Sequence, residues 1–240
     1  MIPFMTGPLR LRQHVAHGTS LAIIVITAGV AAVAFTISEP ISGSLAVALT
    51  AGAVIGAVAG ARTVLRIPAL RLRQIFGIFL IVVSLRLILM ETVNPLLDIS
   101  GTGEYAIGAG IGLAGGLASG ALGIGGGAIF VPALVLILGV GQHEAQGISL
   151  WVVVAASLVG GVTHYRQGTV DMRVARRIAP AALPAAIAGV LLATSLSGRS
   201  LQVLFAVILS AIGAQMLVTA TRRLRQERLT GATESAVDAA

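Results

Sequence analysis

Apolar stretches long enough to cross a lipid bilayer restrict the fold of this chain more than any other feature of its sequence. The first part of the chain has such runs at residues 18–36, 44–65 and 72–91. Four more follow at residues 105–122, 147–164, 173–196 and 200–221. Within lipid, backbone N–H and C=O groups must bond to one another inside the segment, as they do in a helix. The runs therefore predict an all-α, polytopic integral membrane protein.

Composition agrees with a protein that lies in lipid. Charged residues make up 10% of the 240 residues and hydrophobic residues 56%, whereas soluble domains carry about 25% charged residues. The sequence contains no cysteine, which excludes disulfides and thiolate chemistry. No group of histidine, aspartate and glutamate has the spacing of metal ligands, so we expect no metal and no cofactor.

The positive charge indicates how the chain is oriented in the membrane. The formal charge of +7 comes entirely from arginine, because the chain has no lysine. Arginines cluster at 62–73, 173–177 and 222–228, whereas the junctions 37–43 and 93–104 contain none. Basic loops between membrane spans mark the cytoplasmic side. We therefore expect a multi-pass protein of the cell or inner membrane with a cytoplasmic C-terminus and no nucleic-acid partner.

The chain contains an internal repeat. Residues 3–21, PFMTGPLRLRQHVAHGTSL, resemble residues 132–150, PALVLILGVGQHEAQGISL. The two segments align without gaps at a constant separation of 129 residues, which also pairs Gly60 with Gly189. Self-similarity at a fixed separation indicates a repeated structural unit.

The repeat defines the organisation that we expect. Residues 1–92 form a first repeat, 93–104 an extracytoplasmic linker, 105–222 a second repeat and 223–240 a cytoplasmic tail that is disordered beyond Arg228. A full copy has an odd number of apolar segments, so the two copies should face opposite ways across the membrane. Inverted repeats with broken helices are typical of secondary transporters.

A glycine run, GIGGG at 123–127, precedes an apolar segment at 128–139 that is too short to cross a bilayer. In a soluble protein such a run would indicate a phosphate-binding loop, but it lacks the lysine and the strand–helix context of that motif. A helix broken at membrane depth leaves N–H groups that protein or a polar cavity must satisfy. The N-terminus of a half-helix attracts anions. We predict that Gly125, Gly126 and Gly127 bind an anionic substrate, through a broken or re-entrant helix.

Other glycines in the second repeat have a different role. Gly108, Gly112, Gly116 and Gly120 recur every four residues along one apolar run. Small residues at this spacing let membrane helices approach closely. They predict a packing face rather than a binding site.

The segment 116–150, GLASGALGIGGGAIFVPALVLILGVGQHEAQGISL, resembles the signature of the TauE/SafE family of membrane transporters. This family is also called the sulfite exporter or 4-toluene sulfonate uptake permease family. The resemblance rests on the glycine run, a Val-Pro pair and a His-x-Ala-x-Gly-x-Ser helix start, and it covers nearly the whole chain. It implies two homologous halves, each with a glycine-rich arm, that transport small sulfur-containing anions. No first arm precedes Met1, so the first repeat is expected to be incomplete at its N-terminus.

The equivalent helix starts of the two repeats supply the remaining candidate site residues. His14 and His143 either bond the helix turn or bind substrate and carry protons, since histidine titrates near neutral pH. Thr19, Ser20 and Ser149 lie in the first turns of the helices. Their hydroxyls either cap the helix or face the anion.

Together these features predict a secondary transporter, either an exporter or a permease, for sulfite, a sulfonate or another small organosulfur anion. Two inverted halves would provide alternating access, and the absence of an ATP-binding motif indicates that a gradient supplies the energy. Two alternatives stay open. The first is an inactive or accessory membrane subunit. The second is an intramembrane protease using Ser119 with His143 or His164, whose spacing fits poorly, so we expect no enzyme. The small-residue helix faces permit a homodimer.

Overall fold

The computed structural model describes residues 13–63, 69–89, 101–122 and 127–237. The helices in these ranges are α2 (Gln13–Ser38), α3 (Gly43–Thr63), α4 (Ala69–Leu89), α5 (Thr102–Leu122), α6 (Gly127–Leu138), α7 (Gln142–Arg166), α8 (Met172–Ser195) and α9 (Gly198–Val237). Five of them, α2, α4, α7, α8 and α9, are long and apolar enough to cross a membrane. The prediction of an all-α, polytopic membrane protein is confirmed.

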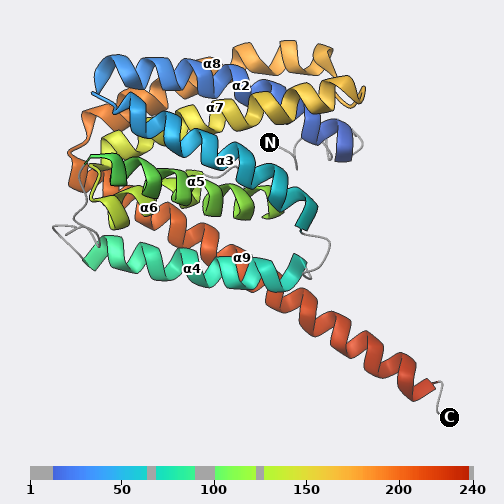
Figure 1. Cartoon of the computed structure of the whole chain (residues 1–240). Helices are drawn as coiled ribbons and strands as arrows, with labels where there is room; N and C mark the ends of the chain where they lie inside the picture. Colours follow the sequence, from blue (N-terminus) through green and yellow to red (C-terminus); the bar gives the residue numbers. More distant parts are fainter. Residues whose placement is uncertain (1–12, 64–68, 90–100, 123–126, 238–240) are drawn as a thin grey trace.

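The helices lie side by side in layers (Figure 1). One layer holds α2, α7 and α8, the middle layer α3, α5 and α6, and the third α4 and α9. Helix α9 continues beyond the bundle and stays helical to Val237. The expectation of disorder beyond Arg228 is therefore wrong up to Val237, although residues 229–237, LTGATESAV, include threonine, glycine, serine and valine, which do not favour helix.

Helix starts recur at the separation found in the sequence. Helices α2, α3 and α4 begin at 13, 43 and 69, whereas α7, α8 and α9 begin at 142, 172 and 198. Each start in the second set lies 129 residues after its counterpart in the first. The helix starts therefore follow the register of the sequence repeat.

Corresponding helices pack against one another in opposite directions. Near one end of α2, Trp151 Nε1 donates a hydrogen bond to Thr36 Oγ1 at 3.0 Å. Near the other end, a Cβ placed on Gly18 would collide with the carbonyl of Thr169, just beyond α7. Helices α4 and α9 pair likewise, since Gln74 Nε2 bonds Thr221 Oγ1. The pairs α2/α7 and α4/α9 are both antiparallel.

Helices α3 and α5 run parallel and touch backbone to backbone. A Cβ on Gly52 would collide with the carbonyl of Ala109, and one on Gly112 with the carbonyl of Leu49. Gly116 meets Ala53 in the same way. The predicted packing face is confirmed for the part that the structure describes, because only residues without a side chain let the two helices approach this closely.

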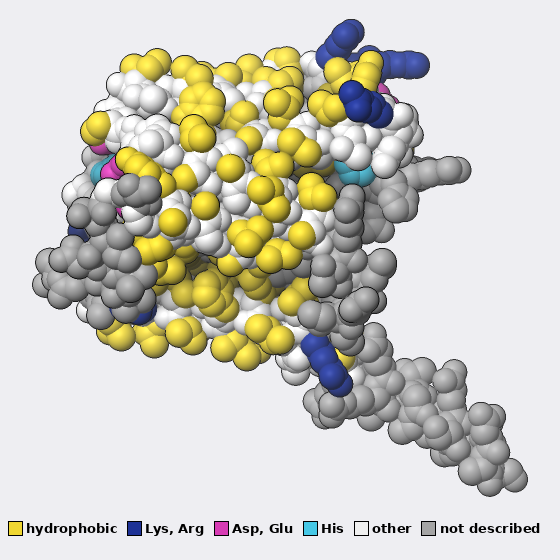
Figure 2. All heavy atoms as spheres, in the orientation of Figure 1, with side chains coloured by type: hydrophobic (Ala, Val, Ile, Leu, Met, Phe, Trp, Pro, Cys, Tyr) yellow, Lys and Arg dark blue, Asp and Glu magenta, His cyan; other side chains and the backbone are white. Residues whose placement is uncertain are grey.

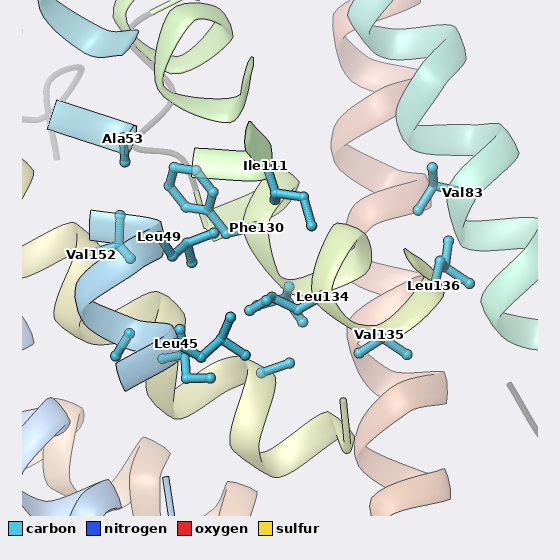
Figure 3. Close-up of a cluster of buried hydrophobic side chains, with 14 of the residues drawn as sticks. Leu45, Leu49, Ala53, Val83, Ile111, Phe130, Leu134, Val135, Leu136 and Val152 are labelled. Carbon is cyan, nitrogen blue, oxygen red and sulfur yellow. The ribbon is translucent and has the colours of Figure 1, made fainter. Parts of the chain in front are cut away.

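The 12-residue helix α6 lies at the centre of the largest apolar cluster. In Figure 3, Phe130 lies beside Leu49 of α3 and Ile111 of α5, while Leu136 faces Val83 of α4. Burial on so many sides is expected for a helix that is hydrophobic all round. Helix α6 is too short to cross a bilayer, as predicted for 128–139.

The outside of the bundle is apolar along its length. Large hydrophobic side chains that are more than half exposed include Ile55, Ile75, Val82 and Leu191. Figure 2 shows hydrophobic side chains spread over the sides of the helices, with arginine side chains at their ends. An apolar surface of this extent marks contact with lipid.

Candidate functional site

A cavity of about 310 Å³ opens where α2, α6, α7, α8 and α9 meet. Its walls are mostly apolar and include Phe35 of α2, Val131 of α6, Val190 of α8 and Phe205 of α9. The helices that form it come from both halves of the chain. A largely apolar cavity with a few convergent polar groups is the usual form of a small-molecule site.

The N-terminus of α6 meets a hydroxyl at this cavity. Gly127 begins α6 and lines the cavity together with Ser149 of α7. A Cβ added to Gly127 would lie 3.4 Å from Ser149 Oγ, so the α6 backbone and the hydroxyl are close neighbours. The first N–H groups of a helix lack partners within the helix and carry its positive end. Hydroxyl and N–H donors at one cavity suit an anion.

Two predicted site residues, Gly127 and Ser149, are thus brought together. Gly125 and Gly126 lie outside the described residues. The backbone of His14 lies in the first turn of α2, but its side chain is outside the described part.

His143 holds the end of α8. Its Nε2 lies 3.2 Å from the carbonyl oxygen of Ala193 and 3.1 Å from that of Leu196. Both oxygens are acceptors, so Nε2 carries a proton and donates, which leaves Nδ1 as the acceptor nitrogen. Ala193 lines the cavity. His143 therefore positions one wall of the site rather than lining it.

Thr19 and Ser20 are buried but do not line this cavity. The Thr19 hydroxyl accepts a hydrogen bond of 2.9 Å from the backbone N–H of Asp171, the residue that caps α8. At the opposite end of α2, Glu144 Oε1 accepts from the N–H of Ser42, just before α3, at 3.0 Å. These two bonds join the halves of the chain.

Sequence reasoning missed Gln146 as a site residue. Gln146 lines the cavity together with Ser149, which follows it by three positions, about one turn of α7. That spacing was the available signal, because residues three apart share a helix face. Within the described residues no three histidine, aspartate or glutamate side chains are grouped to hold a metal ion.

Comparison with known proteins shows the family to which the chain belongs. The family model described as sulfite exporter TauE/SafE matches residues 1–87 and 108–238. The chain belongs to the TauE/SafE family. It is also 26% identical over 220 residues to "Probable membrane transporter protein YunE" of Bacillus subtilis (strain 168), covering 85% of this chain and 81% of that protein. No solved structure matches the chain.

Family membership and the apolar helices agree on the general role of the protein. It is a multi-pass membrane protein of a family that functions in membrane transport. The predicted family is confirmed. The identity of the substrate rests on the chemistry of the cavity.

Proposed function

We propose that this protein is a secondary transporter for a small anion, namely sulfite, a sulfonate or another organosulfur anion, and that it is not an enzyme. One observation carries the proposal. The N-terminus of the short helix α6 and the Ser149 hydroxyl meet at a cavity formed by helices of both halves. The family description, sulfite exporter, supports the same substrate class.

The cavity offers donors for the oxygens of an anion and apolar walls that suit the organic part of a sulfonate. Ser149 and Gln146 offer O–H and N–H donors, and the α6 N-terminus adds backbone N–H groups. The rings of Phe35 and Phe205 and the side chain of Val131 form apolar walls. Neutral donors hold an anion without a fixed ion pair, so release does not require breaking a buried salt bridge.

The arrangement of the halves supports transport by alternating access. The antiparallel pairing of α2 with α7 and of α4 with α9 supports two inverted repeats around the central site. The bonds Thr19–Asp171 and Glu144–Ser42 tie the halves at opposite ends of α2. In the transport cycle each bond would break when its own end opens.

The positions of the arginines support an orientation of the chain in the membrane. Helices α4 and α8, whose first turns carry arginines, begin at the end of the bundle from which α9 emerges (Figure 1). From the positive-inside rule we expect this end, and the C-terminus, to lie on the cytoplasmic side of the cell or inner membrane. The surrounding bilayer is then the main partner, with a homodimer as a further expectation.

Proton coupling through His14 or His143 belongs to the same proposal. Nε2 of His143 makes both carbonyl contacts, which leaves Nδ1 outside them. In a His143→Gln variant, the amide can still donate to a carbonyl but does not titrate. We expect its transport to lose the pH dependence of the wild type between about pH 5 and 8. An unchanged pH profile would exclude His143 as the coupling group.

Anion flux into proteoliposomes tests the proposal directly. The purified chain is reconstituted, and uptake of sulfite and of an aromatic sulfonate is measured with and without a pH gradient. Ser149→Ala is expected to raise KM about tenfold, because a hydrogen bond to a charged group contributes roughly 1.5–3 kcal/mol. Ser157→Ala is the matched control, since Ser157 is buried on the same helix but outside the cavity.

Two results would contradict the proposal. Folded wild-type protein without flux of either anion would contradict the transporter proposal and favour an accessory subunit. Equal effects of Ser149→Ala and Ser157→Ala would contradict the placement of the site.

A further inference from the structure

The first residue of α7 has an unusual side chain. Gln142 is only 6% exposed, and neither Nε2 nor Oε1 of its amide has a hydrogen-bond partner. Buried polar groups are nearly always hydrogen-bonded, because leaving water without a replacement partner is costly. The neighbouring His143, by contrast, uses Nε2 on two carbonyl oxygens. An unpartnered buried amide therefore indicates a missing ligand.

Gln142 lies on the face of α7 that forms the site. Helix geometry places residues four and seven apart on one side, so Gln142, Gln146 and Ser149 form a single polar line along α7. Gln146 and Ser149 line the cavity, and Gln142 extends the line by one turn toward the start of α7. The line leads from the cavity to the end of the bundle at which α7 begins.

We propose that Gln142 is a ligand of the transported anion on its way between the cavity and that end of the bundle. Its NH₂ group donates hydrogen bonds to the oxygens of the anion, as Gln146 and Ser149 do one and two turns further on. This inference rests on the proposed transport of an oxyanion. A neutral amide suits a transit position, because it replaces part of the water shell of the anion without holding it in an ion pair.

Gln142→Leu tests the inference, with Gln202→Leu as the matched control. Gln202 is also a buried glutamine, 7% exposed, but its Nε2 donates to the carbonyl of Leu87 at 3.0 Å. In proteoliposome flux of sulfite and an aromatic sulfonate, Gln142→Leu is expected to raise KM roughly tenfold. Its thermal unfolding midpoint without anion should stay equal or rise, because an unsatisfied amide is removed. Gln202→Leu should show the reverse, with a lower unfolding midpoint and an unchanged KM.

A second variant keeps the test decisive if the leucine variant does not fold. Gln142→Glu has the same shape but replaces the donor by a carboxylate that repels anions, so flux should fall further than in the leucine variant. Wild-type flux together with an unaltered KM in Gln142→Leu or Gln142→Glu would overturn the role of Gln142 alone. Absence of both flux and anion-induced thermal stabilisation in the wild type would instead overturn the transporter proposal itself.

Discussion

Helices α3 and α8 occupy corresponding places in the two halves but have different surroundings. Their starts are separated by the repeat distance, at 43 and 172. On α3, Gly52 and Gly56 are buried against α5. At the same register positions of α8, Ala181 and Ala185 are exposed, and α8 packs mainly against α2.

The difference shows how a covering helix changes what a position requires. Where α5 meets α3, the backbones touch and no Cβ fits. On α8 a Cβ at Gly189 would have nothing within 4 Å, so even the remaining glycine there is not required by a neighbour. The same small-residue pattern therefore makes a tight interface in one half and an open face in the other.

The largest effect that follows from this comparison is expected at Gly52. Gly52→Val should destabilise the protein by about 3 kcal/mol or more, because two branched methyl groups would enter the carbonyl of Ala109 and separate α3 from α5. Thermal unfolding of the purified protein in detergent measures this as a lower midpoint or as loss of folded protein. A midpoint like that of the wild type would mean that α3 and α5 are not in backbone contact.

A smaller effect is expected at the N-terminus of α8, where Thr19 of α2 holds the capping residue. Thr19→Val should cost about 1–3 kcal/mol, because the N–H of Asp171 at the start of α8 loses its acceptor. Thr19→Ser keeps the hydroxyl and should lose much less, which separates the hydrogen bond from side-chain packing. Thermal unfolding of the two variants checks this, and equal losses would argue against the bond.

The smallest effect is expected on the open face. Ala181→Val should change the free energy of unfolding by no more than about 0.5 kcal/mol, because the added methyl groups meet no other helix. It is the counterpart of Gly52→Val in the other half. A loss as large as that at Gly52 in the same unfolding assay would show that another helix covers α8 in the membrane.

Much of the fold could be predicted from sequence, because lipid permits few structures. Long apolar runs give helices directly, and the short run at 128–139 corresponds to α6. The constant separation of 129 residues anticipated the helix starts. The sequence did not indicate that α5 covers the small residues of α3 while those of α8 stay exposed, because both helices carry small residues at corresponding positions. Burial of a helix face depends on which other helix packs against it, and the composition of the face does not show which helix that is.

The site was predicted in part for a similar reason. The glycine run and the motif serine pointed to Gly127 and Ser149, which line one cavity. Thr19 lies in an equivalent helix start, yet its hydroxyl bonds the N-terminus of α8. The motif thus marks positions, while the orientation of each side chain is set by contacts between the halves. Gln146 is not part of a recognised motif, and it was identified as a candidate only because it lines the cavity.

The short central helix has a consequence for how the chain enters the membrane. At 1.5 Å per residue, the 12 residues of α6 span roughly 18 Å, well short of the hydrocarbon core of about 30 Å. Alone in lipid, its ends would expose backbone groups that cannot be hydrated. Helix α6 is therefore expected to be stable in the membrane only when its neighbours, α7 among them, pack around it. The half that contains the candidate site is thus expected to become stable as a packed unit rather than one helix at a time.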